Sequence, residues 1–463
     1  MHHGLIGCRV SPDSGRQASY RDVFAVGEFR VMWVAQAVSL LGNQLAQVAL
    51  SILVYHRTHS AFLTAMAYAL TYLPQIIGGP VLSGLADLFP RRAVMICFDL
   101  LRLPLVAAMA IPAIPFSALC VLVTGITVSG VPFTAARTAL LPDVLPGDRL
   151  PLGSAIGNVT DQFSQVIGFT TGALIVAWLN PYRALLLDAL TFAVSALLVA
   201  GWVTRRPAPS RERADDREQR GGKESRDEPS LWSRTCAGMR LVAQNPVLRC
   251  LVLFGWLGGF YVIPEALAAP YAHALGQGSV AVGLLMAAMP VGTIVGALVF
   301  VRLIPTDRRL AMLGWLAMLA CVPLIGSAAR PPLPVVLALL AVAGVGSGYQ
   351  VIAAAAFLQR LPDSGRGAAF GFAASGVLAA QGLGFLAGGA AAQAIGPQLV
   401  VAIAGAAGLG AAAILTVAWA RVRTGRLPSQ LGYPAEGRNV AEQAASRYPP
   451  HTPPSPQRPG ASA

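Results

Sequence analysis

The ten residues Ser83–Arg92, with the sequence SGLADLFPRR, lie between two long apolar stretches at about 61–86 and 93–113. They bring a glycine, an aspartate and a pair of arginines together where the two stretches meet. Apolar stretches of about twenty residues are long enough to cross a bilayer as helices, and arginine favours connections on the cytoplasmic side. This segment, called the charged hairpin below, therefore predicts two membrane-spanning helices joined by a short cytoplasmic connection.

The composition of the chain is that of an integral membrane protein. Hydrophobic residues make up 55% of its 463 residues and charged residues 12%, whereas a soluble protein carries about 25% charged residues. The net charge of +13 would suggest a nucleic-acid partner in a soluble protein. Here the basic residues lie at the ends of apolar segments, where membrane orientation explains them better. We expect a lipid bilayer as partner and no nucleic acid.

Twelve apolar segments of spanning length are expected, six on each side of a long charged stretch. They lie at about 28–54, 61–86, 93–113, 116–139, 150–178, 183–203, 247–273, 279–303, 309–328, 333–359, 366–394 and 396–420. The predicted organisation is a cytoplasmic tail at 1–27, a six-helix half at 28–203, a cytoplasmic loop at 204–246, a second six-helix half at 247–420 and a disordered cytoplasmic tail at 421–463. The loop is dense in charged residues and cannot cross a bilayer, with an amphipathic piece expected near Trp232.

Arginines in the short connections indicate the orientation. If both termini are cytoplasmic, nine arginines lie at short cytoplasmic connections and three at outer ones, namely Arg57, Arg183 and Arg330. Basic residues are enriched on the cytoplasmic side of membrane proteins. We therefore expect a multi-pass protein of the plasma or inner membrane with both termini in the cytoplasm.

An internal repeat supports two related halves. After the fourth segment, Arg137 precedes a Leu-Pro-Asp sequence that ends at Asp143. After the tenth segment, Arg360 precedes the same three residues, ending at Asp363. Self-similarity at corresponding places is the mark of a duplicated architecture.

The charged hairpin, placed between the second and third of twelve segments, resembles the signature of the major facilitator superfamily. In that signature a glycine is followed by an aspartate and then by a basic pair, here Gly84, Asp87, Arg91 and Arg92. The resemblance covers essentially the whole membrane region. It implies an all-α fold of twelve transmembrane helices in two pseudo-symmetric six-helix halves, with a cargo cavity between them that opens alternately to either side.

Two further stretches resemble the branch of the superfamily that includes the enterobactin exporter and macrolide efflux proteins. They are ARTALLPDVLP at 136–146 and DLLR at 99–102. The chain departs from the family pattern in the hairpin, the fifth helix and the first helix, at Leu88, Pro90, Phe169 and Asn43.

The resemblance also implies a role for the charged hairpin as a conformational latch. In the superfamily this hairpin is thought to hold the two halves together in one state and release them in the other. The latch would consist of Gly84, Asp87, Arg91 and Arg92, with Arg137 as a candidate partner for Asp87. The alternative is that the arginines only orient the chain.

Two charged residues of the third segment are expected to pair inside the membrane. Asp99 and Arg102 are three residues apart and share a helix face. An unpaired charge at this depth is costly, so we expect an intramembrane ion pair.

Other acids inside the segments are candidates for proton coupling, because a buried carboxyl can bind and release a proton. Glu265 and Asp161 are the candidates, and the alternative for each is a locally satisfied polar side chain. Asp188 lies near the outer end of its segment, where a pair with Arg183 is the simpler interpretation.

Amide and aromatic side chains inside the segments are candidates for cargo binding. Amides in a helix bundle either hold helices together or line a water-filled path, and the sequence leaves both open. The candidates are Asn43, Gln47, Asn158, Gln165, Tyr261, Gln350 and Gln381.

Together these features favour a secondary transporter. The resemblance implies proton-coupled export of a hydrophobic or amphiphilic small molecule, such as a drug, a macrolide-like metabolite or a siderophore. The alternatives are a proton-coupled importer of a small nutrient and a non-transporting receptor or assembly partner that uses the 204–246 loop. The sequence holds no phosphate-binding loop, metal cluster or catalytic set. We therefore expect no enzyme, no metal and no cofactor, with the proton gradient as energy source, and a monomer as is usual for the fold.

Overall fold

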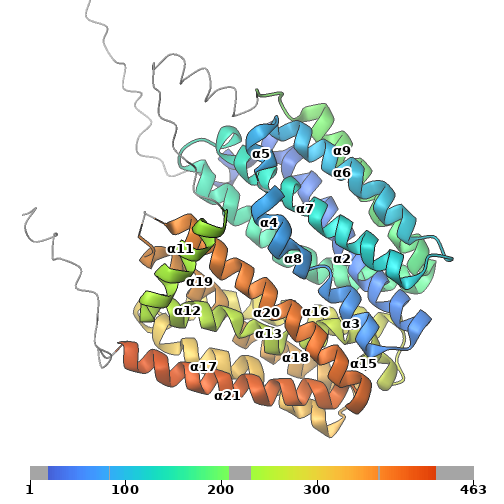
Figure 1. Ribbon diagram of the computed structural model, residues 1–463, viewed down its shortest axis with the longest axis vertical. Coiled ribbons are helices and arrows are strands. Elements are labelled where there is room, and N and C mark those ends of the chain that lie inside the picture. The colour runs from blue at the N-terminus through green and yellow to red at the C-terminus, as the bar shows by residue number, and fades with distance from the viewer. Residues whose placement is uncertain (1–18, 83, 208–230, 363–364, 424–463) are drawn as a thin grey trace, which may run out of the picture. The chain divides into compact units, whose positions relative to one another are not determined.

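The computed structural model describes residues 19–82, 84–207, 231–362 and 365–423 (Figure 1). Every regular element in these ranges is a helix, which confirms the all-α prediction. The chain divides into a compact unit, Met1–Trp419, and a second unit, Ala420–Ala463. The account below concerns the first unit, to which both predicted six-helix halves belong as far as Trp419.

The helices of the first half are α1 (Tyr20–Phe24), α2 (Gly27–Thr58), α3 (Ala61–Ala69), α4 (Leu73–Leu82), α5 (Leu85–Leu88), α6 (Arg91–Met109), α7 (Phe116–Val144), α8 (Arg149–Leu179) and α9 (Pro181–Trp202). The predicted central loop contains α11 (Leu231–Gln244). The second half follows with α12 (Pro246–Trp256), α13 (Gly258–Tyr261), α14 (Ile263–Ala266), α15 (Ala268–Ala274), α16 (Ser279–Leu303), α17 (Thr306–Ile325), the 3₁₀ turn η1 (Gly326–Ala329), α18 (Leu333–Ser347), α19 (Tyr349–Arg360), α20 (Arg366–Ile395) and α21 (Pro397–Arg423).

Each predicted segment coincides with one helix or with a line of short ones. Within the described residues, ten spans are long and apolar enough to cross a membrane. The second predicted segment is not among these ten spans, because it is divided among the short helices α3, α4 and α5. The third predicted segment, α6, is not among them either, because its four charged residues make it too polar: Arg91, Arg92, Asp99 and Arg102.

The seventh predicted segment is not one continuous helix but a series of four short helices. It consists of α12, α13, α14 and α15, with Pro264 inside α14 and Pro270 inside α15. Proline lacks an N–H group and its ring disturbs the preceding turn, so it bends or ends a helix. As a result Glu265 lies in the four-residue helix α14, in the middle of a broken helix.

The most extensive contacts between the two halves are those of α3 with α20 and of α8 with α16, and α20 crosses the second half in Figure 1. Small residues allow the close approach. Gly389 of α20 faces Ala65 of α3, and Gly283 of α16 faces Phe169 and Ala173 of α8. A side chain at either glycine would push the halves apart.

Part of the predicted central loop is helical. The amphipathic piece expected near Trp232 lies in α11, which extends to Gln244. Gly238 of α11 packs against Ala368 at the start of α20. Residues 208–230 of the predicted loop lie outside the described residues, as do those after Arg423 in the tail for which we predict disorder.

The crossing of α16 and α18 should be sensitive to a single added methyl group. A Cβ atom at Gly344 would lie on the carbonyl oxygen of Met289, closer than two unbonded atoms can approach. We expect Gly344→Ala to reduce the free energy of unfolding by about 1–3 kcal/mol, the usual cost of overpacking. Thermal unfolding of the purified variant in detergent measures this.

The matched control is Gly410→Ala in α21, where an added Cβ meets no atom within 4 Å. Since alanine has a better helix propensity than glycine, this variant should unfold at the wild-type temperature or slightly above it. Equal losses in the two variants would contradict the close crossing at Gly344.

Candidate functional site

A cavity of about 1310 Å³ lies between the two halves. Its wall comes from α2, α4, α6, α7, α8 and α9 of the first half and from the beginning of α20 in the second. The charged residues of the wall all belong to the first half: Arg102, Arg137, Asp161 and Asp188. Helix α20 contributes glycine, alanine and the aromatic residues Phe370 and Phe372. One side of the cavity is therefore charged and the other is small and apolar.

The cavity extends to helix ends that the sequence predicts to be cytoplasmic. Its wall includes Gly367, the second residue of α20, and Ala139, close to the end of α7. On α2 the wall begins at Gln36 and continues to Leu50. The cavity thus runs from the predicted cytoplasmic ends into the interior of the helix bundle.

At the opposite helix ends the two halves are in contact. The Ser60 hydroxyl, just before α3, donates a hydrogen bond of 3.0 Å to Oε1 of Gln393 in α20. The rings of Tyr55 in α2 and His273 in α15 have centroids 5.4 Å apart. These contacts, called the outer contact below, join the halves at the end predicted to face outward.

Glu265 links the outer contact to the cavity. The hydroxyl of Tyr68 lies 3.2 Å from Oε2 of Glu265 in α14 and 3.3 Å from Oε1 of Gln47 in α2. A hydroxyl has one proton, so Tyr68 donates to one of these oxygens at a time. Phe385 of α20 packs edge-on against the Tyr68 ring, with centroids 5.1 Å apart. Because Gln47 lines the cavity, the Gln47–Tyr68–Glu265 contacts connect it to the second half.

Asp161 lines the cavity beside Arg137, and Gln36 joins the two. Gln36 donates from Nε2 to Oδ1 of Asp161 over 3.0 Å and accepts a hydrogen bond from Nη1 of Arg137. Sequence analysis missed Gln36, although Gln36, Asn43 and Gln47 recur at the spacing of one helix face, which is the signal that could have found it.

The predicted ion pair of α6 is present and buried. Nη1 of Arg102 lies 3.5 Å from Oδ1 of Asp99. Ser195 of α9 donates a hydrogen bond of 2.6 Å to the other oxygen of Asp99, and Arg102 donates one of 3.1 Å to the Ser129 carbonyl of α7. The pair therefore joins three helices of the first half.

The predicted pair of Asp188 with Arg183 is wrong. Asp188 is only 1% exposed and lines the cavity. Its partners are the Thr191 hydroxyl, 3.2 Å from Oδ1, and the charge of Arg102. Arg102 comes from a different helix, which sequence spacing within α9 could not reveal.

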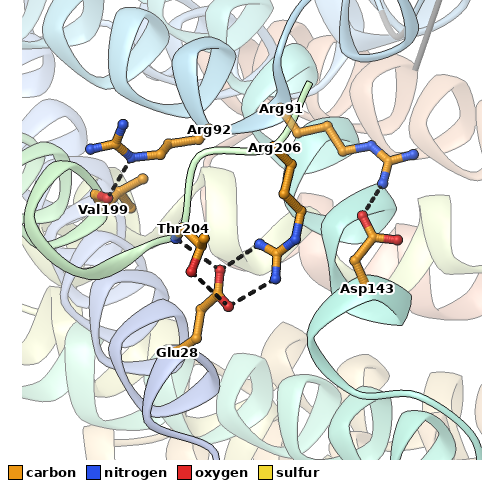
Figure 2. A network of polar contacts seen from close by, with 7 residues as sticks. All are labelled: Glu28, Arg91, Arg92, Asp143, Val199, Thr204 and Arg206. Carbon is orange, nitrogen blue, oxygen red and sulfur yellow. Dashed lines mark hydrogen bonds and ion pairs between the residues drawn. The ribbon is translucent and has the colours of Figure 1, made fainter. Parts of the chain in front are cut away.

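The arginines of the charged hairpin hold helix ends of the first half together (Figure 2). Arg91 forms an ion pair of 2.5 Å with Asp143 at the end of α7. Arg92 donates a hydrogen bond of 3.3 Å to the Val199 carbonyl in the last turn of α9. Cations near a helix C-terminus also interact favourably with its dipole. These described contacts all lie within one half.

Glu28 holds the chain that leaves α9 (Figure 2). Its two carboxylate oxygens accept hydrogen bonds of 2.6 and 2.9 Å from Arg206, and the Thr204 backbone N–H donates one of 3.1 Å. The hydrogen bond to Glu28 raises the pKa of Arg206 above its ordinary value. The start of the central loop is thereby fixed to the start of α2.

The latch between halves stays a prediction. Gly84 lies directly before α5 and Asp87 within it, but the side chain of Asp87 is outside the described residues. Arg137, the candidate partner of Asp87, contacts Gln36 in the cavity wall.

The cavity brings together three of the seven candidate cargo-binding residues, Asn43, Gln47 and Gln165. Asn158 lies in the wall of a smaller neighbouring cavity of about 140 Å³, together with Gln36.

Tyr261 and Gln350 lie inside the second half instead. Nε2 of Gln350 is 2.5 Å from the hydroxyl of Tyr261, which is 3.3 Å from the hydroxyl of Tyr349. The amide of Gln381 lies close to Gly258 in the same region. These side chains join helices of the second half and do not belong to the wall of the large cavity as the structure describes it.

Comparison of the sequence with known proteins finds one matching family description. The family model of the Major Facilitator Superfamily matches residues 32–265 and 258–451. Macrolide efflux protein A of Streptococcus pyogenes is 27% identical over 241 residues, which covers 51% of this chain and 56% of that protein. An uncharacterized MFS-type transporter of Sinorhizobium fredii is 26% identical over 311 residues, covering 64% and 71%. The chain spans about half the length of the macrolide efflux relative.

Solved structures show the same fold. A peptide transporter POT in complex with sulfate has a TM-score of 0.66 at 14% identity, covering 88% of this chain and 96% of that one. A mutant of the nucleoside transporter NupG has a TM-score of 0.65 at 12% identity, covering 84% and 99%. At such low identity the likeness concerns the fold alone.

The hydrogen bonds of Gln36 predict a measurable contribution to stability. Gln36→Leu removes the group between Arg137 and Asp161 and leaves both charges without that partner. We expect a loss of about 1–3 kcal/mol, the usual cost of an unsatisfied buried polar group. Thermal unfolding in detergent measures the effect.

The control is the same substitution two turns along the helix, at Gln44, whose buried Oε1 has no hydrogen-bond partner among the described residues. Gln44→Leu should be neutral or stabilising, because it removes an unsatisfied polar atom. A smaller loss for Gln36→Leu than for Gln44→Leu would contradict the bridging role of Gln36.

Proposed function

Because the chain belongs to the Major Facilitator Superfamily, we propose that it is a secondary transporter that exports a hydrophobic or amphiphilic small molecule in exchange for protons. The observation that carries the proposal is the cavity between the halves, charged on one wall, with the halves joined at its far end by the outer contact and by the Tyr68–Glu265 hydrogen bond. Membership in a superfamily of transporters argues against an enzyme. Several apolar helices long enough to cross a bilayer place the protein in a membrane.

The cavity wall supports an amphiphilic cargo. Its volume of about 1310 Å³ exceeds the roughly 300–1,000 Å³ usual for drug-sized ligands. Leu40, Met109, Phe370 and Phe372 supply apolar contacts, while the amides and acids described above supply polar ones. A relative named macrolide efflux protein A is consistent with a cargo of this size and with export.

Glu265 is suited to couple a proton to the outer contact. As a carboxylate it accepts the hydrogen bond from Tyr68 across the two halves. Protonation removes the negative charge and weakens its attraction for the donor. In the proposed cycle Glu265 takes up a proton from outside when the outer contact opens, and the cargo leaves. The proton is then released to the cytoplasm.

Asp161 is the second candidate for coupling. It lines the cavity, where cargo can reach it, and its polar partners are Gln36 and the charge of Arg137. A cargo that displaced Gln36 would change the surroundings of this carboxyl. The proton gradient is the proposed energy source, with both termini cytoplasmic and the monomer as the working unit.

Transport in cells tests the proposal. We expect cells that contain the protein to accumulate less of some lipophilic dyes or macrolide antibiotics, and a protonophore to abolish the difference. Glu265→Gln should raise accumulation to the level of cells without the protein, because the amide cannot exchange a proton. Asp161→Asn should have the same effect if the cavity carboxyl is the coupling group.

The matched control is Asp148→Asn, an exposed acid before α8 that makes no capping hydrogen bond. It should export like wild type. Export that persists in both Glu265→Gln and Asp161→Asn would contradict the proposed coupling mechanism. Higher accumulation in cells with the protein would instead establish import.

A further inference from the structure

Three buried ionisable side chains lie beside the cavity, and their charges do not balance, because two are acidic and one is basic. Asp99, Arg102 and Asp188 are 0%, 4% and 1% exposed. Arg102 interacts electrostatically with both acids. Two carboxyl groups therefore share one guanidinium group.

Asp99 alone is enough to neutralise the positive charge of Arg102. Asp99 lies 3.5 Å from Arg102 and also accepts a hydrogen bond of 2.6 Å from Ser195. Asp188 has one weaker donor, the Thr191 hydroxyl at 3.2 Å, and that hydroxyl also lies 2.7 Å from the Asp188 carbonyl oxygen. The single hydroxyl proton serves one of them at a time. Asp188 is thus the less compensated of the two acids.

The surroundings of Asp188 offer no further cation among the described residues. From α6, Arg102 interacts with it electrostatically and is paired with Asp99. From α2, Gly42 lies against the carboxyl, since a Cβ atom there would clash with Oδ1 of Asp188. Asp161 of α8 lines the same cavity but is bonded to Gln36. An ion left uncompensated in such a place is unfavourable, and a carboxyl group avoids it by binding a proton.

We propose that Asp188 carries an exchangeable proton, with Arg102 shared between Asp99 and Asp188 according to whether that proton is bound. With the proton in place, the cluster is neutral and Arg102 pairs with Asp99. When the Asp188 carboxyl group releases its proton to water in the cavity, it becomes a carboxylate and the cluster carries one negative charge. Arg102 is then attracted by both acids.

Arg102 would transmit this change to the cavity wall. Its guanidinium lies between two aromatic rings, 5.1 Å from the Phe133 centroid and 5.3 Å from that of Phe192. Nε of Arg102 and Oδ1 of Asp99 have no hydrogen-bond partner among the described residues. Arg102 and Phe133 both line the cavity. A small shift of the guanidinium would therefore alter the charge and shape of the cavity wall that the cargo meets.

Infrared difference spectroscopy on the purified full-length protein in detergent tests the proposal. Spectra at acid and alkaline pH are compared in the region of the C=O stretch of protonated carboxyl groups. Wild type should show a band that is lost in Asp188→Asn and kept, at a shifted frequency, in Asp188→Glu. The second variant preserves the test if Asp188→Asn does not fold. Asp148→Asn, at an exposed acid, should leave this band unchanged.

Variants of the other two candidate carboxyls show whether the infrared band belongs to Asp188. Asp161→Asn and Glu265→Gln should each leave the Asp188 band in place. If Asp188→Asn and Asp188→Glu both retain the wild-type bands, the proposal is overturned. It is also overturned if every protonated-carboxyl band of wild type disappears in the Asp161 and Glu265 variants.

This inference deepens the proposed function, since a proton site in the cavity wall would serve proton-coupled export. The spectra nevertheless measure protonation without transport. A protein that shows the Asp188 band but exports nothing would retain the proton site and lose the proposed function. A protein that exports without this band would lose only the proton site.

Discussion

Every charged side chain that leaves water inside the membrane must be compensated within the protein, and this constraint shapes the first half. Two clusters satisfy it. Gln36, Arg137 and Asp161 join α2, α7 and α8, while Asp99 and Arg102 join α6 to α7 and α9. The compensating groups come from different helices, so the charges also fix how those helices sit together. Polar chemistry thus holds the first half in shape and gives the cavity its charged wall.

The contacts between the halves are of another kind. They consist of small residues at close crossings, aromatic pairs and isolated hydrogen bonds such as that between Ser60 and Gln393. A neutral hydrogen bond contributes about 0.5–1.5 kcal/mol and an aromatic pair a similar amount. A few such contacts are compatible with an interface that opens when a ligand binds one state better than the other. An ion-pair cluster across the halves would resist such a motion far more.

The length of the apolar runs predicted most of the fold, because membrane helices must be long, apolar and internally hydrogen-bonded. The predicted segment at 279–303 coincides with α16. The division of the seventh segment into four helices was not predicted, since proline and glycine bend or interrupt a helix according to what packs against them. The Asp99–Arg102 pair was within reach of sequence because its spacing is local.

The parts of the site that sequence missed depend on distant partners. Gln36 meets Arg137 and Asp161 more than a hundred positions away in the chain. Asp188 looked like a partner of Arg183, yet its environment is set by Arg102 on another helix. The sequence of a single chain does not reveal such pairings. In each case the polar side chain in an apolar segment indicates that a polar partner is needed. It does not indicate which residue that partner is.

Glu265 and Asp188, two of the three carboxyls proposed to exchange protons, differ in one respect that bears on mechanism. Glu265 is bonded to Tyr68 of the opposite half, whereas Asp188 has all its described partners within its own half. In alternating access, contacts between the halves change and contacts inside a half persist. Opening of the outer contact would therefore act on Glu265 directly. Asp188 would respond instead to what occupies the cavity, through Arg102 and the charge of the cargo. On these proposals the protonation of Glu265 follows the opening of the outer contact, and the protonation of Asp188 follows the occupancy of the cavity.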